Sequence, residues 1–164
     1  MNCSTRKAYC KLASLLEIAC FNFASCEIAQ KAGAHRIEFC ADYRSGGITP
    51  SEKDITQIKK SIHIPVHVII RPRGGDFIYS TEEINKMKES ILLCKQHGID
   101  GVVFGVLNSD RTINLQVCIE LLELAKPMKS VFHRAIDQVN DIENEIEKLI
   151  SLKFESVLTS GRKR

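Results

Sequence analysis

Short apolar runs alternate along the chain with longer amphipathic stretches. The runs predict strands, and the stretches, with apolar residues at helical spacing, predict helices between them. The predicted strands are 15–19, 36–40, 66–70, 101–105, 129–133 and 155–158. The predicted helices are 25–32, 51–62, 80–98, 115–125 and 142–152. The run Val66–Ile70 is rich in β-branched residues and predicts a strand buried on both faces.

The alternation of strand and helix predicts right-handed crossovers and a parallel sheet of the α/β class. Predicted strands begin every 20 to 35 residues, which suits a TIM-like (β/α) barrel and also a doubly wound sheet. No G-x-G-x-x-G motif follows the first strand, so a Rossmann dinucleotide site is not indicated.

The composition is that of a soluble globular protein. Of the 164 residues, 44% are apolar and 26% are charged, and the net charge of +3 is too small to indicate a nucleic-acid partner. The seven cysteines contain no C-x-x-C pair and are an odd number, which argues against a disulfide framework. A reducing, cytoplasmic location is the simplest interpretation.

Residues 1–14 are predicted to be a flexible N-terminal leader, and residues 15–164 a single domain. The leader carries basic residues and no acid, but the apolar run that follows is interrupted by Glu17. No apolar span of 18 residues exists anywhere in the chain, so no membrane partner is expected.

Polar residues follow the predicted strands where each strand ends. The third strand ends in Arg71-Pro72-Arg73-Gly74-Gly75, with Asp76 directly after it. Proline cannot donate to a sheet, and paired glycines favour a loop, so the strand must stop there. Ligands bind at this end of parallel sheets, and we expect Arg71, Arg73 and Asp76 to bind substrate. The alternative is an ion pair between Arg71 and Asp76 that only braces the loop.

Acidic and basic groups recur at the other strand ends. Glu17 and Glu38 interrupt apolar strands, His133 and Arg134 end the fifth strand, and Ser160 follows the sixth. We expect Glu17, Glu38 and His133 to be catalytic acid–base groups, because buried carboxylates and imidazoles acquire shifted pKa values. The arginines and Ser160 would bind a small anionic substrate. The alternative is a set of polar residues that only satisfy one another.

Two cysteines lie close behind the strand glutamates, at Cys20 and Cys40. Neighbouring parallel strands run about 4.8 Å apart, so both thiols could reach one soft metal ion such as Cu(I). The alternative is that both are small buried apolar residues.

Seven segments form a distinctive set: they are 16–20, 33–40, 46–50, 69–77, 100–105, 132–135 and 158–161, and Arg71-Pro72-Arg73-Gly74-Gly75-Asp76-Phe77 is the most specific sequence among them. Together they resemble the CutC family. The resemblance covers about residues 15–161. It implies a TIM-like barrel, a cytoplasmic location and a role in copper homeostasis, with Cys20 and Cys40 as Cu(I) ligands.

Family members continue through two further strand–helix units, so we expect a barrel truncated after its sixth strand. Open sheet edges favour pairing with another chain, and we expect a homo-oligomer. Three interpretations remain open. One is cytosolic Cu(I) handling through the cysteines, the second is an enzyme acting on a small anion at the barrel mouth, and the third is a fragment with no activity of its own.

Overall fold

Strands and helices alternate along the computed structural model, which describes residues 14–161. The strands are β1 (Glu17–Cys20), β2 (Arg36–Phe39), β3 (Val66–Ile69), β4 (Gly101–Phe104), β5 (Lys129–Phe132) and β6 (Ser156–Val157). The α-helices are α1 (Phe23–Lys31), α2 (Glu52–Ser61), α3 (Thr81–Gln96), α4 (Leu115–Ala125) and α5 (Ile142–Ser151). Two short 3₁₀ helices, η1 (Tyr43–Ser45) and η2 (Arg134–Gln138), follow β2 and β5. The predicted leader lies, except for Ser14, outside the described residues.

The predicted order of elements is confirmed, and two of the predicted starts are wrong by two residues. Helix α1 begins at Phe23, two residues earlier than predicted, because the Asn22 side chain accepts a hydrogen bond from the Ser25 N–H and caps the helix. Strand β1 begins at Glu17, two residues later than predicted. Leu15 and Leu16 lie before it and are 57% and 49% exposed, so these two apolar residues are not part of a buried strand.

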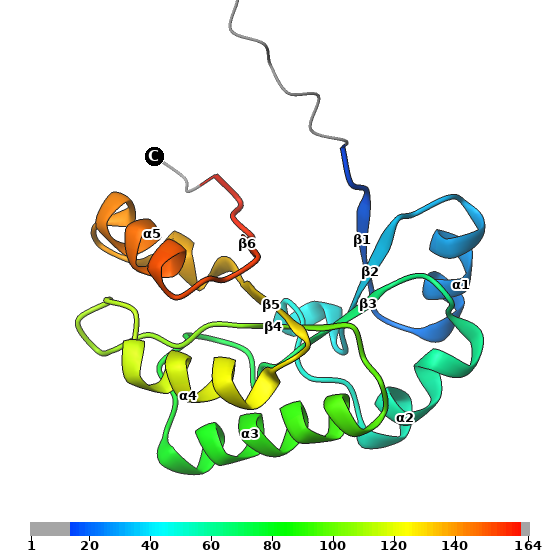
Figure 1. Ribbon diagram of the computed structural model, residues 1–164, viewed down its shortest axis with the longest axis horizontal. Helices are drawn as coiled ribbons and strands as arrows, with labels where there is room; N and C mark the ends of the chain where they lie inside the picture. The colour runs from blue at the N-terminus through cyan, green and yellow to red at the C-terminus, as the bar shows by residue number, and fades with distance from the viewer. Residues whose placement is uncertain (1–13, 162–164) are drawn as a thin grey trace, which may run out of the picture.

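The six strands form one parallel sheet in sequential order, β1-β2-β3-β4-β5-β6. Sequential order fits the barrel alternative, since a doubly wound sheet reverses its strand order part of the way along. The sheet curls as a half-barrel, with helices along its outer side and β1 and β6 at its two ends (Figure 1). We call the helix-covered side the outer face and the concave side the inner face.

Alternate residues of each strand lie on opposite faces. On the outer face, Ile37, Phe39 and Phe104 pack into one core with side chains of all the helices. On the inner face, Glu38 and Ile69 point into the curve and line a cavity instead. The barrel interior therefore carries polar groups, while the apolar core lies between sheet and helices.

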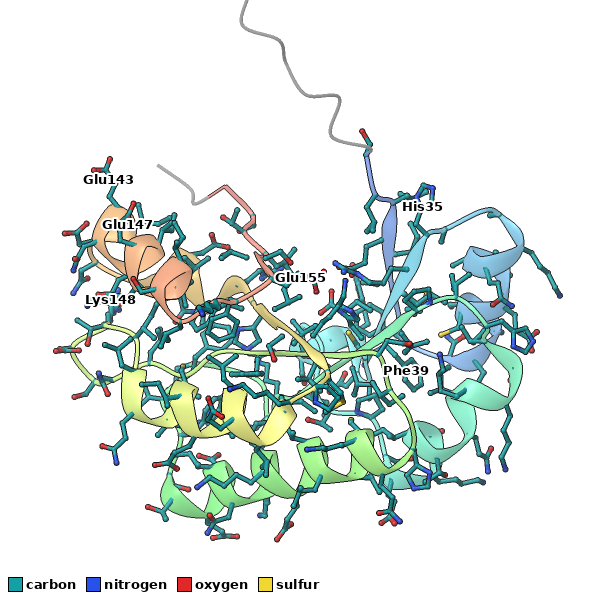
Figure 2. All side chains as sticks on the ribbon, viewed as in Figure 1. His35, Phe39, Glu143, Glu147, Lys148 and Glu155 are labelled. Carbon is teal, nitrogen blue, oxygen red and sulfur yellow. The ribbon has the colours of Figure 1, made fainter. Side chains whose placement is uncertain are left out.

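Charged residues tie the amino ends of the strands together. Arg36 at the start of β2 pairs with Glu17 of β1, and its second guanidinium nitrogen lies 3.9 Å from Glu155, just before β6. Glu155 also accepts from Lys129 at 2.6 Å. Figure 2 shows Glu155 between the β5–β6 side and the β1–β2 side of the molecule. These pairs reach across the curve and connect the two ends of the sheet.

A hydrogen bond from the backbone to a side chain supports the same end of the sheet. His35 lies beside the start of β1 (Figure 2), where its Nδ1 accepts a hydrogen bond of 2.8 Å from the Leu16 N–H. Among the described helices, none combines the length and the apolar character needed to cross a bilayer.

Replacing Arg36 with Met should destabilise the fold, because Glu17 and Glu155 would lose the cation between them. We expect the free energy of unfolding in urea to fall by about 2 kcal/mol, as for hydrogen bonds to charged groups. Lys86→Met is the matched control. Its pair with Glu82 is exposed on α3, and its loss should cost less than about 0.5 kcal/mol. Equal losses in the two variants would show that the Arg36 cluster does not hold the half-barrel together.

Candidate functional site

A cavity of about 300 Å³ opens at the carboxyl ends of the strands. Parallel alignment brings the loops that follow β2, β3, β5 and β6 to this one end. Its polar lining includes Glu38, Cys40, Arg71, His133, Arg134 and Ser160. The structure therefore gathers most of the predicted site residues around one space.

Arg71 builds the wall of this cavity. It is 6% exposed, and its guanidinium donates to the carbonyls of Ser45 and Gly47 at 2.8 and 3.0 Å and to that of Gly75 at 2.8 Å. Its backbone N–H also donates to the Thr49 hydroxyl. Arg71 thus joins the loop after β2 to the loop after β3, and the ion pair with Asp76 that was the alternative does not form, since Asp76 pairs with Arg73.

His133 directly follows β5 in the sequence and is buried, with 2% of its surface exposed. Its ring packs against Phe77, with centroids 4.6 Å apart, and the Arg71 guanidinium carbon lies 4.9 Å from the same Phe77 ring. Burial, and then the charge of Arg71, lower the pKa of His133 to about 3. The imidazole is therefore neutral at physiological pH.

Glu38 faces the cavity from the middle of β2. Burial, and then the charge of Glu17, raise the pKa of its carboxyl to about 7, against the lowering effects of Arg36 and Arg134. The Cys40 thiol, which donates to the Glu38 backbone carbonyl at 3.9 Å, also lies close enough to this carboxyl to lower its pKa slightly. Such a carboxyl can give or take a proton near neutral pH.

Arg134, at the start of η2, is exposed at the rim of the cavity. Within the described part of the chain, no side chain or carbonyl forms a hydrogen bond or ion pair with its guanidinium. Beside it, Asp137 accepts hydrogen bonds from Ser160, through both its N–H and its hydroxyl, and from the Thr159 hydroxyl. These contacts hold the loop after β6 against the loop after β5.

Three of the residues predicted to be catalytic or to bind substrate lie elsewhere. Glu17 is at the opposite, amino end of β1, paired with Arg36. Arg73 donates to Glu83 of α3 at 2.6 Å and to Asp76 at 3.0 Å. These contacts hold Arg73 and Asp76 outside the cavity lining. Glu17 acts on the cavity only through its charge, which raises the pKa of Glu38.

The structure places Cys20 and Cys40 on opposite faces of the sheet. Cys20 belongs to the outer core with Cys26 and Ala29, whereas Cys40 lines the inner cavity. The residue of β1 that faces the cavity is Ala19. Because the two thiols face opposite sides of the sheet, this arrangement argues against one metal ion shared between them. No cluster of three or more potential metal ligands occurs among residues 14–161.

Burial also affects the chemistry of the two thiols. It raises the pKa of Cys20 and that of Cys40, and the carboxylate of Glu38 raises the pKa of Cys40 further. Both cysteines are therefore protonated at physiological pH unless a metal ion displaces the proton.

Sequence reasoning gave no site role to three residues of this region. Phe77 lies in the segment 69–77 and Asp137 lies three residues after Arg134, but only the structure shows the ring contact of one and the loop contacts of the other. His67, on β3, is fully buried on the inner face, and burial lowers its pKa to about 4. An isolated histidine in an apolar run carries no sequence signal that separates it from a core residue.

Comparison with known proteins identifies relatives along nearly the whole chain. A family model described as the CutC family matches residues 14–164. A copper homeostasis protein cutC homolog from Homo sapiens is 46% identical over 147 residues, which is 90% of this chain and 54% of the human protein. The chain thus spans little more than half the length of that curated relative.

Solved structures agree with the fold. A CutC structure from Streptococcus agalactiae superposes with a TM-score of 0.86 at 33% identity, covering 92% of this chain and 74% of the other. An oxaloacetate acetylhydrolase superposes with a TM-score of 0.64 at 12% identity, covering 92% and 60% of the two chains. The second likeness is one of fold alone.

The raised pKa of Glu38 predicts a pH-dependent stability. The folded state keeps this proton up to about pH 7, while an ordinary glutamate loses it near pH 4.5. Between these values the unfolded state binds fewer protons, so the stability contributed by protonated Glu38 is lost as pH rises from 4.5 to 7. We therefore expect Glu38→Gln to be increasingly more stable than the native chain across this interval in denaturant titrations.

Glu89→Gln, an exposed carboxyl on α3, is the matched control and should show no such trend. A constant difference in stability between Glu38→Gln and the native chain over this pH range would contradict the buried, protonated state of Glu38.

Proposed function

We propose, from the premise that this chain belongs to the CutC family, that its strand-end cavity binds a small anionic molecule and performs acid–base chemistry on it. The single observation that carries this is the unpaired Arg134 guanidinium at the rim of a cavity that also holds Glu38 and neutral His133. Arginine presents a fork of donors that matches carboxylate and phosphate groups.

The division of the two cavity arginines supports an anion site. Arg71 is held by three backbone carbonyls and shapes the wall, so its charge is fixed in place. Arg134 keeps its donors available to a ligand. Glu38, and not Glu17, is the carboxyl that such a ligand would meet, and His133 is the only imidazole in the cavity lining within residues 14–161.

The volume of the cavity suits a small metabolite. A cavity of about 300 Å³ is at the lower end of the range for small-molecule sites, which favours a ligand of few heavy atoms. Ser160, whose hydroxyl is tied to Asp137, would form the far side of the site.

Copper handling is the second candidate function, and the family membership favours it, since a relative at 46% identity is named for copper homeostasis. Cys40 is the cysteine whose thiol lines the cavity, and thiolates select Cu(I). We propose that a Cu(I) ion handled by this chain as cargo binds at Cys40 and displaces its proton. Cys20 lies behind the sheet and would take no part.

Replacing Arg134 with Gln tests the anion site. We expect the dissociation constant for inorganic phosphate or propionate, measured by calorimetric titration, to rise about tenfold, because a charge-assisted contact is lost. Arg111→Gln removes an exposed guanidinium outside the cavity and should leave both constants unchanged. Loss of affinity in both variants would indicate only a general charge effect.

Titration of the reduced protein with Cu(I) against a chromogenic chelator tests the second function. Cys40→Ser should abolish tight binding, and Cys20→Ser should retain it, because the two thiols face different sides of the sheet. Equal loss in the two variants would restore the shared site. Unchanged binding in Cys40→Ser would show that copper does not bind in the cavity.

A further inference from the structure

One ring nitrogen of His133 has a hydrogen-bond partner, and the other has none among the described residues. Its Nδ1 accepts a hydrogen bond of 3.4 Å from the Ala135 N–H, as the cap of η2. A nitrogen that accepts cannot carry the proton of a neutral ring, so the proton lies on Nε2. The Nδ1 side is also closely packed, because a Cβ at Gly105 would lie 2.8 Å from Nδ1.

The Nε2–H is a buried donor without an acceptor in the described part of the chain. A tilted ring contact with Phe77 and an edge contact with Phe132, at 4.6 and 6.0 Å between centroids, hold the ring in this orientation. The ring also lines the cavity. Buried donors are normally paired, so the structure leaves a position for an acceptor atom that the chain itself does not supply.

The next residue supplies the other half of the recognition. Arg134 follows His133 directly, and its unpaired guanidinium is exposed at the rim. A ligand that reaches both residues has its negative charge toward the rim and an uncharged acceptor deeper inside. The negative charge itself gains more from the guanidinium of Arg134 than from the uncharged ring of His133, because guanidinium and carboxylate pair through two charge-assisted hydrogen bonds.

We infer that the cavity takes a small carboxylic acid with an oxo or hydroxyl oxygen close to its carboxylate, and that this oxygen accepts from Nε2 of His133 while the carboxylate pairs with Arg134. The inference rests on the proposed anion site and names its substrate class. His133 then selects among small acids, because an acid without the second oxygen leaves the buried donor unpaired.

Three probes of matched size test this selection, namely propionate, lactate and pyruvate. They share the carboxylate and differ in the neighbouring carbon, which carries no oxygen, a hydroxyl or an oxo group. In the native chain, lactate or pyruvate should bind about tenfold more tightly than propionate, as expected for pairing a buried donor. Whichever of the two binds more tightly identifies the oxygen.

Two variants connect the preference to His133. His133→Phe keeps an aromatic ring without a donor and should bind the three acids equally. His133→Gln offers an amide N–H near the position of Nε2 and should retain the preference. A nitrogen NMR spectrum of the native chain, which needs no variant to fold, should show His133 with its proton on Nε2 at neutral pH.

Equal affinity of the native chain for all three acids would overturn this inference and leave the anion site in place. Failure of every acid and of phosphate to bind would overturn the anion site as well. A proton on Nδ1 would overturn the inference by itself, since Nε2 would then accept rather than donate.

Discussion

The alternation of side chains along the parallel strands is the constraint on which both the core and the cavity depend. Ile37 and Phe39 face the helices while Glu38, between them, faces the cavity. A shift of one residue in the pairing of β2 would bury the carboxyl among the helices and expose Phe39 to the cavity. The apolar core therefore fixes which polar groups meet at the carboxyl ends of the strands.

This constraint explains how far the sequence could predict the site. The order of elements and the meeting of Glu38, Arg71, His133 and Arg134 follow from strand–helix periodicity and from the geometry of parallel sheets. The face on which a residue lies depends on where its strand begins. At β1 the exposed Leu15 and Leu16 extended the apolar run, so the sequence alone could not separate Cys20 from Ala19.

The roles of the arginines show a second limit, because they depend on contacts distant in sequence. Arg71 and Arg73 flank one proline and look equivalent in the sequence. Arg71 donates to carbonyls of two loops, whereas Arg73 pairs with Glu83, ten residues away on α3. Arg134 had no feature that marked it as the unpaired one. Only tertiary structure tells which guanidinium is structural and which is available to a ligand.

Comparison of the two buried histidines separates a candidate site from a packing feature. A glycine makes room for each ring, Gly101 for His67 and Gly105 for His133, and burial keeps both rings neutral. Each ring has a nitrogen without a partner among the described residues. His67 lies on β3 and is not part of the cavity lining, and the charge of Arg36 lowers its pKa further. His133 alone joins such a nitrogen to a cavity and an unpaired cation, so position, rather than burial, makes it the candidate for ligand recognition.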